Sequence, residues 1–291
     1  MRVADAWKEY ELLDCSGGER LERWGDYVLI RPDPQVLWRS PKDAAWEQAH
    51  ALYRRSASGG GAWGTRKPMP EIWTIAYGEL RFQLKRMGFK HTGLFPEQAV
   101  NWDLLGRFIR EAGRPLRILN LFAYTGAATI ACLVAGASVT HVDAAKGMVT
   151  WAKENAALNG LADKPVRWIV DDCIKFVQRE QRRGRQYDVI LMDPPSYGRG
   201  PGGEVWKLED EIHALIADCA KLLSPEAILM LVNTYSTGLS PATMAYMLGM
   251  EVAAQRGGAL SSDEIGLRVA NTGFVLPCGA SAVWSREALN L

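Results

Sequence analysis

The chain has 291 residues, and its 34 lysines and arginines almost balance 33 aspartates and glutamates, for a net charge of +1 at pH 7. So small a charge excludes a protein that coats nucleic acid through its overall field, so any contact with a polyanion has to be local. No run of about 18 apolar residues or leader pattern is present, and the five cysteines are widely spaced without a Cys-x-x-Cys pair. We expect a cytoplasmic protein with no membrane segment and no metal site; its oligomeric state stays open.

Strand patterns dominate the first hundred residues. Residues 10–32 and 71–86 are typical of hairpins that turn at Gly-Gly, Gly-Asp and Gly-Glu. A short helix is expected near 43–55 and a loose glycine-rich loop at 56–64. Residues 1–95 are therefore predicted to form a small β-rich appendage.

From Leu116 onward, aliphatic runs alternate with helical patterns. The expected strands, each buried on both faces, are 116–122, 138–143, 166–170, 187–193 and 227–234, and the expected helices are 125–136, 145–160, 172–184 and 204–224. Right-handed crossovers place helices on both sides of such a sheet, so residues 96–291 are predicted to form a doubly wound, mostly parallel α/β domain of Rossmann-like type. Residues 264–286 indicate two further strands at an antiparallel edge.

Acidic residues follow the second and third of these strands. In a doubly wound fold the ligand lies beyond the carboxyl ends of the strands, where the strand order reverses. The first turn, "NLFAYTGAAT", contains Thr125 and Gly126 at a helix start, but one glycine does not make the pyrophosphate cradle of a nicotinamide dehydrogenase. Asp143 is placed to accept both hydroxyls of a ribose. Asp172, after Asp171, is placed to cap the next helix or to contact an adenine amino group, and the two roles can coexist.

The fourth strand ends in Asp193-Pro194-Pro195. The prolines lack N–H groups and fix φ, so the carbonyls before and between them are expected to stay free and to form, with the carboxylate, an acceptor pair for an amino or ring N–H. Tyr197 is placed to stack on a planar base. The pattern favours methyl transfer to nitrogen, in which the protein mainly positions two reactants; a plain turn leaving a strand is the alternative.

Three acidic strand ends without a diphosphate grip indicate a nucleoside that carries a small charged group. S-adenosylmethionine fits, because carboxylates tolerate its ammonium and sulfonium, while the helix N-terminus suits its carboxylate. A nicotinamide dinucleotide is disfavoured because its glycine fingerprint is missing.

Several stretches also carry a resemblance to a known family. From about residue 90 the chain resembles class I S-adenosylmethionine-dependent methyltransferases, specifically the bacterial group related to large-subunit ribosomal RNA cytosine and guanine methyltransferases. The stretches are "HTGLFPEQ", "LNLFAYTGAATIACLVAGA", "VTHVDAAKGMVTWAKENAALNG" and "DDCIKFVQREQRRGRQYDVILMDPPSYGRGPGGEVW".

The resemblance implies a role for individual residues. Tyr124, Thr125 and Gly126 would line the methionine end of the cofactor, Asp143 the ribose, Asp172 the adenine, and Asp193, Pro194 and Pro195 the methyl-acceptor side. Phe95 and Gln98 would lie over the cofactor. The predicted cofactor site also takes in Asp193 and the neighbours Phe122, Ala123, Ala144, Asp171 and Cys173.

One departure from the family pattern bears on the methylated atom. Members that methylate carbon 5 of cytosine carry a nucleophilic cysteine after the fifth strand, because an aromatic carbon needs covalent activation. Here that segment reads "VNTYSTG", with Thr234, Tyr235 and Ser236 and no cysteine. Nitrogen methylation is therefore favoured.

A local excess of basic residues points to RNA as the partner. Between residues 54 and 91, eight basic residues stand against two acidic ones, with aromatic residues interleaved: Arg54, Arg55, Arg66, Lys67, Arg81, Lys85, Arg86 and Lys90, with Trp63, Trp73, Tyr77, Phe82, Phe89 and His91. Such a mixture is typical of a surface for single-stranded or loop RNA, or of a hairpin with one solvated face. We expect a methyltransferase for a base nitrogen of RNA, ribosomal in the leading reading. The alternatives are a methyltransferase for a small molecule or a protein side chain, and a noncatalytic RNA-binding protein on the same scaffold.

Overall fold

The structure, a computed structural model, describes residues 1–56, 60–199, 205–235 and 239–288. The chain divides into two compact units. The first unit consists of Met1–Val100 and Ile265–Cys278, and the second of Asn101–Glu264 and Gly279–Leu291. The boundary expected after residue 95 stays a prediction of domain organisation.

The first unit is built from β-strands. One sheet has the order β2 (Tyr10–Ser16), β3 (Glu19–Trp24), β4 (Tyr27–Pro32), β5 (Ala51–Arg55) and β6 (Gly61–Thr65). A separate antiparallel hairpin consists of β7 (Ile72–Tyr77) and β8 (Leu80–Lys85). Short elements complete the unit: β1 (Arg2–Val3), and the 3-10 helices η1 (Ala44–Gln48) and η2 (Pro96–Gln98). The hairpins predicted at 10–32 and 71–86 are thereby confirmed.

Two predictions for this unit are wrong. The helix expected near 43–55 is a 3-10 helix over 44–48 only, and residues 51–55 form strand β5. The apolar start of β5 is buried and pairs with β4 on one side and β6 on the other, so partners distant in sequence decide its conformation. Residues 61–64 of the expected loop belong to β6, while 57–59 lie outside the described residues.

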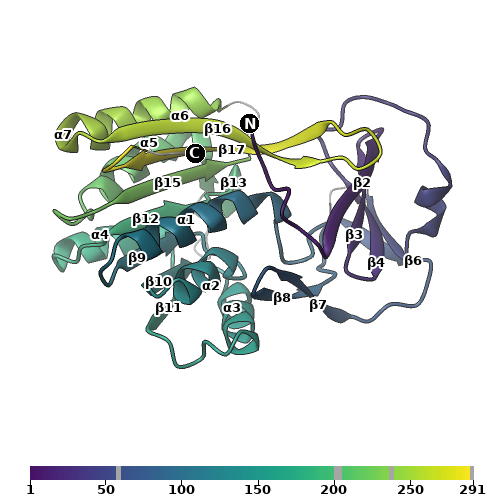
Figure 1. Cartoon of the computed structure of the whole chain (residues 1–291), viewed down its shortest axis with the longest axis horizontal. Coiled ribbons are helices and arrows are strands. Elements are labelled where there is room, and N and C mark those ends of the chain that lie inside the picture. Colours follow the sequence, from purple (N-terminus) through teal and green to yellow (C-terminus); the bar gives the residue numbers. More distant parts are fainter. Residues whose placement is uncertain (57–59, 200–204, 236–238, 289–291) are drawn as a thin grey trace. The chain divides into compact units, whose positions relative to one another are not determined.

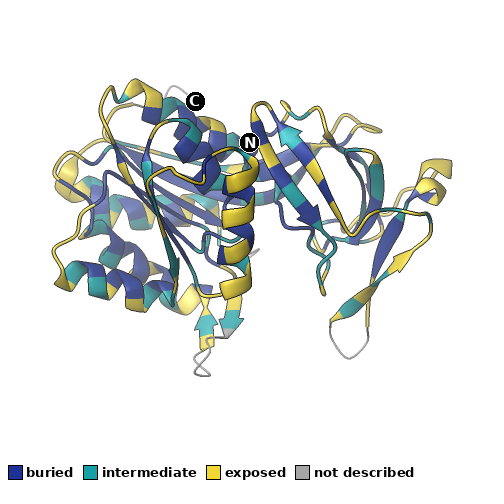
Figure 2. Cartoon of the chain, turned by 90° about the horizontal axis from the view of Figure 1, so that it is seen from below, coloured by how far each residue is buried: buried dark blue, intermediate teal, exposed yellow. Residues whose placement is uncertain are grey.

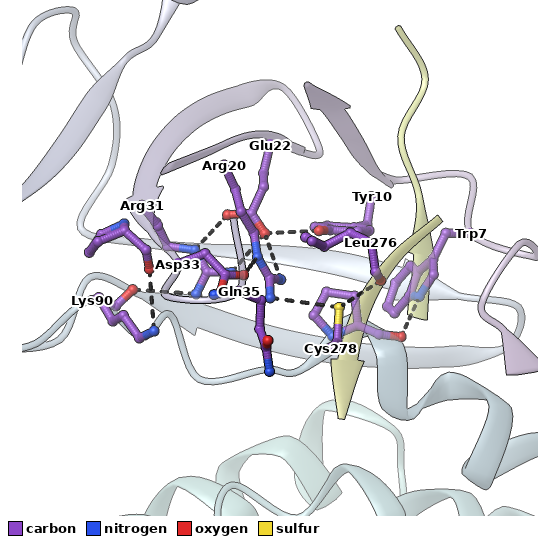
Figure 3. Close-up of polar contacts among 12 residues, drawn as sticks. Trp7, Tyr10, Arg20, Glu22, Arg31, Asp33, Gln35, Lys90, Leu276 and Cys278 are labelled. Carbon is purple, nitrogen blue, oxygen red and sulfur yellow. Dashed lines mark hydrogen bonds and ion pairs between the residues drawn. The ribbon is translucent and has the colours of Figure 1, made fainter. Parts of the chain in front are cut away.

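A buried polar cluster, which we call the Glu22 cluster, lies inside the first unit (Figure 3). The fully buried carboxylate of Glu22 accepts hydrogen bonds from Tyr10 Oη at 2.8 Å and from Arg31 Nε and Nη2 at 2.6 and 2.7 Å. Burial alone would raise the pKa of Glu22, but the Arg31 guanidinium holds it below its usual range. Arg20 pairs with Asp33 and donates through Nη2 to Cys278 Sγ at 3.6 Å. The cluster therefore ties β3 and β4 to the C-terminal segment of the same unit.

The second unit contains the predicted parallel sheet. Its strands are β9 (Arg117–Leu121), β10 (Ser138–Asp143), β11 (Val166–Val170), β12 (Val189–Met192) and β15 (Leu229–Thr234). They are parallel in the order β15-β12-β9-β10-β11, so the strand order reverses between β9 and β12. Strand β17 (Val275–Ser285) runs antiparallel to β15, and β16 (Ala259–Arg268) follows it in the sheet. The mostly parallel sheet and its antiparallel edge are confirmed.

Helices cover both faces of this sheet (Figure 1). They are α1 (Ala99–Glu111), α2 (Ala127–Val134), α3 (Lys146–Leu158), α4 (Cys173–Arg182), α5 (Leu208–Ala220) and α6 (Pro241–Leu248), followed by a π-helical turn (Gly249–Ala253) and α7 (Ala254–Arg256). Apolar residues of α4, α5 and α6 pack on one face of the strands and form the large core, while α2 and α3 pack together against β10. Figure 2 shows the buried residues concentrated along the strands and on the inner sides of the helices.

Two details of this unit differ from the predictions. Strand β11 is not buried on both faces: it is the edge of the sheet, and Val170 is 49% exposed. The helix expected from residue 204 begins at Leu208, because Val205–Lys207 forms strand β14, which pairs antiparallel with β13 (Tyr197–Arg199). Among the described residues, no helix is long and apolar enough to span a bilayer.

Candidate active site

The carboxyl ends of three parallel strands, β10, β11 and β12, bring the predicted acids to one edge of the sheet. Asp143 is the last residue of β10, Asp171 directly follows β11, and Asp193 directly follows β12. Backbone bonds continue the pairing at this edge, because the Asp171 amide donates to Asp143 O at 3.1 Å and the Asp193 amide to Leu121 O at 3.5 Å. Asp143 and Asp193 thus flank the end of β9, on the two sides of the point where the strand order reverses.

The turn between β9 and α2 is strained and held from outside. Phe122 and Tyr124 have φ values of 54° and 50°, in the left-handed region that costs a residue with a side chain about 1–3 kcal/mol. The Phe122 amide donates to Cys173 Sγ at 3.3 Å and the Tyr124 amide to Asp143 Oδ2 at 2.9 Å. Asn155 Nδ2 on α3 donates to Thr125 O at 3.0 Å. Side chains from three other elements therefore fix the shape of this turn.

Gly126 serves packing in this turn. Its φ is 87°, and a Cβ at this position would lie 2.8 Å from Ala152 Cβ on α3. Its amide donates to Ala123 O at 3.0 Å. The space that the missing side chain leaves is thus used for the close approach of α2 and α3, and the role of Gly126 toward a ligand stays a prediction.

The carboxylate of Asp143 is both anchored and able to bind more donors. Oδ1 accepts from the Ala145 amide at 2.8 Å and Oδ2 from the Tyr124 amide at 2.9 Å. A carboxylate offers about four acceptor positions, so the chemistry of Asp143 fits the two hydroxyl donors of a ribose. Burial raises the pKa of Asp143, although the two amides oppose the shift. Ala144, which follows it, is exposed.

Asp171, Asp172 and Cys173 have partners within the chain. Asp172 caps α4, because its Oδ1 accepts from the Lys175 amide at 2.9 Å, and Asp171 forms an ion pair with Arg179. The thiol of Cys173 is buried, and burial raises its pKa well above the usual value. The cap is therefore found, whereas contacts of Asp172 and Cys173 with an adenine stay predictions.

The Asp193-Pro194-Pro195 turn is supported by two residues that sequence reasoning missed. Asn233 Nδ2 on β15 donates to Asp193 Oδ1 at 2.9 Å, and Trp206 Nε1 on β14 donates to Pro195 O at 2.5 Å. The Trp206 ring also lies 5.5 Å from the Phe122 ring. In the sequence, Asn233 could have been noticed as the one amide side chain in an aliphatic strand, and Trp206 as an aromatic residue soon after the Pro-Pro pair. Tyr197, on β13, is 51% exposed.

Phe95 and Gln98 belong to the first unit. Phe95 precedes η2, its ring lies 5.3 Å from that of His91, and its carbonyl accepts from the Gln98 amide at 3.1 Å. Their predicted position over a cofactor stays a prediction. Among the described residues, no cluster of three or more His, Cys, Asp or Glu side chains is arranged to hold a metal ion.

Comparison with known proteins decides the family of the chain. The model of the S-adenosylmethionine-dependent methyltransferase family matches residues 33–243. The chain belongs to this family. A solved structure, the SAM-dependent methyltransferase from Agrobacterium tumefaciens, superposes with a TM-score of 0.92 at 39% identity, over 98% of this chain and 93% of that one. A methyltransferase solved in complex with S-adenosylhomocysteine has a TM-score of 0.73 at 20% identity, over 96% of this chain and 76% of that one, and shows the fold alone.

Curated relatives of this family member are named for ribosomal RNA. The ribosomal RNA large subunit methyltransferase K/L of Shewanella baltica strain OS195 is 36% identical over 170 residues, and that of Shewanella frigidimarina strain NCIMB 400 is 34% identical over 165. Each alignment takes in 56% of this chain and 22% of the relative. The chain thus matches about a fifth of the length of these relatives.

The residues of this methyltransferase-family chain fit the family's cofactor. Asp143 retains acceptor positions for ribose hydroxyls, and the carboxylates of Asp143 and Asp193 at one sheet edge suit a cationic sulfonium donor. Side chains of the chain itself hold the strained turn at 122–126. S-adenosylmethionine is the cofactor of the family to which the chain belongs.

Cofactor affinity is expected to fall as the pH is lowered. Ribose hydroxyls at their predicted position would donate to the ionised form of Asp143, and burial raises the pKa of this carboxyl. Cofactor affinity is therefore at its maximum above the raised pKa of Asp143 and decreases by about tenfold per pH unit below it. The decrease should begin at a pH above the ordinary aspartate pKa of about 4. Calorimetric titration with S-adenosylhomocysteine from neutral to acid pH measures it, and D143N should show a flat profile. A wild-type affinity that stays constant down to that ordinary value contradicts the expectation.

Proposed function

We propose that this protein transfers a methyl group from S-adenosylmethionine to a base nitrogen in ribosomal RNA. The observation that carries the proposal is the position of Asp193-Pro194-Pro195. These three residues directly follow β12, at the point where the strand order reverses. Only β9 lies between β12 and β10, the strand that ends in Asp143. An acceptor base bound at Asp193 would therefore meet a donor held at Asp143.

The residues at this position support nitrogen as the methylated atom. When bound, the cofactor supplies an electrophilic methyl group on a sulfonium. Asp193 accepts an N–H of the base and orients the nitrogen, which requires positioning more than acid-base chemistry. The five cysteines of the sequence are all buried, and none follows β15 in the described residues up to Tyr235; Ser236 lies outside them. No exposed thiolate is thus available in the described chain to activate a ring carbon.

Basic residues on the first unit support RNA as the substrate. Arg54, Arg55 and Arg81 are exposed. Half of the interleaved aromatic residues are core instead, because Trp73, Tyr77 and Phe82 are at most 7% exposed. Among these aromatic residues, Phe89, which is 57% exposed, remains the best candidate for stacking on a base. The names of the curated relatives favour ribosomal RNA, which agrees with the cytoplasmic location predicted from the cysteines.

Neutralising exposed arginines of the first unit is expected to weaken RNA binding and its salt dependence. In R54Q/R55Q/R81Q, the slope of log K against log salt should decrease by about 2, because each single-strand phosphate contact contributes about 0.7. Fluorescence anisotropy with a ribosomal RNA fragment at several salt concentrations measures it. The matched control neutralises three exposed arginines of the second unit, R110Q/R182Q/R185Q. Equal slopes in both triple variants would remove the first unit as the RNA surface.

The reaction itself is tested by methylation of ribosomal RNA with methyl-labelled S-adenosylmethionine, followed by mass spectrometry of the nucleosides. A label on a base nitrogen supports the proposal, and a label on carbon overturns its choice of atom. If the label appears in a small molecule or a protein and not in RNA, the result supports the alternative of a methyltransferase for a small molecule or a protein side chain. RNA binding with no methyl transfer to any of them selects the noncatalytic reading.

A further inference from the structure

A chain of buried hydrogen bonds ends on Asp193. Asn101 Nδ2 on α1 donates to Ser281 Oγ on β17 at 3.1 Å, and Ser281 Oγ donates to Asn233 Oδ1 on β15 at 2.7 Å. Asn233 Nδ2 then donates to Asp193 Oδ1 at 2.9 Å. Asn101, Asn233 and Ser281 are 2%, 0% and 0% exposed. Four residues that are far apart in the sequence therefore meet behind the methyl-acceptor side of the site.

All hydrogen bonds of this series run in one direction, from donor to acceptor toward Asp193. An amide nitrogen only donates, and a serine hydroxyl has a single proton. Since Ser281 accepts from Asn101, it gives its proton to the carbonyl oxygen of Asn233. This bond assigns the orientation of the Asn233 amide, with its oxygen toward Ser281 and its nitrogen toward Asp193. The Oδ1 atom of Asp193 is consequently held as an acceptor.

We propose that Asn233 is a positioning residue that fixes the carboxylate of Asp193 as a hydrogen-bond acceptor, so that the site selects a base edge that presents an N–H. Ser281 acts one step further back by fixing the Asn233 amide. A base edge that presents only oxygen or ring-nitrogen acceptors meets like charge and is rejected. This inference rests on the proposed function and names the substrate class more closely: a base with an amino or imino group at the methylated edge.

The first test uses the full chain with N233A, N233D and S281A, with N271A as the matched control, since Asn271 is exposed. Affinity for S-adenosylhomocysteine should stay within about threefold, while kcat on ribosomal RNA should fall by about 100-fold in N233A, because a misplaced reacting group costs about that much. S281A should lose less, because only the orientation of the amide is relaxed. N271A should match wild type.

The pH profile separates positioning from a merely structural role. In N233D a second carboxylate faces Asp193, and the two can share a hydrogen bond only when one is protonated. The activity of N233D should therefore rise as the pH is lowered from about 8 to about 6, which the wild type and N233A should not do. A parallel pH profile of N233D and wild type would overturn the inference.

A readout without substrate keeps the inference separate from the proposed function. The carboxyl carbon-13 signal of Asp193, assigned by its loss in D193N, should titrate at higher pH in N233A than in wild type. If wild type methylates no RNA but this shift occurs, the proposed function fails and the positioning role stands. If wild type methylates RNA and the midpoint is unchanged in both N233A and S281A, the positioning role is overturned. Should N233A not fold, S281A decides alone.

Discussion

Replacement of Asp143 by alanine is expected to weaken binding of S-adenosylhomocysteine by on the order of 10²- to 10⁴-fold. Two hydroxyl donors would each lose a bond to a charged acceptor, at about 1.5–3 kcal/mol per bond, and every 1.4 kcal/mol is about tenfold in affinity. The Tyr124 amide also loses its partner, which relaxes the strained turn at 122–126. Isothermal titration calorimetry at neutral pH measures the loss.

The control for this variant is D163A. Asp163 is exposed and lies before β11, at the amino end of that strand, opposite to the site. D163A should bind the ligand as wild type does, and both variants should unfold cooperatively in a thermal melt. Wild-type affinity in a folded D143A would remove Asp143 from the cofactor site.

Replacement of Asp193 by asparagine is expected to stop methyl transfer while cofactor binding remains. The change preserves size but removes the charge and turns one acceptor into a donor, which faces Asn233 Nδ2 or the acceptor base. We expect kcat to fall by on the order of 10²- to 10³-fold, the scale on which single preorganised electrostatic contacts act. The affinity for S-adenosylhomocysteine should change by less than about threefold, because the residue predicted to hold its ribose is Asp143.

Single-turnover methylation of ribosomal RNA, paired with calorimetry, separates the two effects. D163N provides the same chemical change at an exposed position and should keep both values. A D193N protein that loses cofactor affinity in proportion to its rate would place Asp193 with the cofactor instead of the acceptor. Retention of the full rate would remove Asp193 from the reaction.

Local pattern was sufficient where burial decides the structure. The strands at 138–143 and 166–170 have the predicted bounds, and Asp143, Asp171 and Asp193 stand at strand ends because each follows a run of strand residues. These positions required only the period of the apolar residues and the rule that parallel strands expose one common edge. The acids at these strand ends indicated the cofactor, whereas the family was predicted from the resemblance of whole stretches of sequence.

Long-range contacts decided what the sequence could not show. Val205–Lys207 continues the helical pattern of α5, but pairing with Tyr197–Arg199 and the Trp206 bond to Pro195 make it a strand. Asn233 reads as an ordinary residue of a buried strand, and only the assembled fold places it between Ser281 and Asp193. The spacing of residues along the sequence does not predict these hydrogen bonds, because Asn101, Asp193, Asn233 and Ser281 belong to four separate parts of the fold.

The division of the chain has a consequence for its biosynthesis. The first unit needs Ile265–Cys278 as well as Met1–Val100, and Cys278 receives a hydrogen bond from Arg20 of the Glu22 cluster (Figure 3). A ribosome must therefore translate as far as Cys278 before that unit can close, well after residues 1–100 have been made, which departs from the usual order in which N-terminal domains fold first. The nascent strands of residues 1–100 stay incomplete until residues 265–278 have emerged.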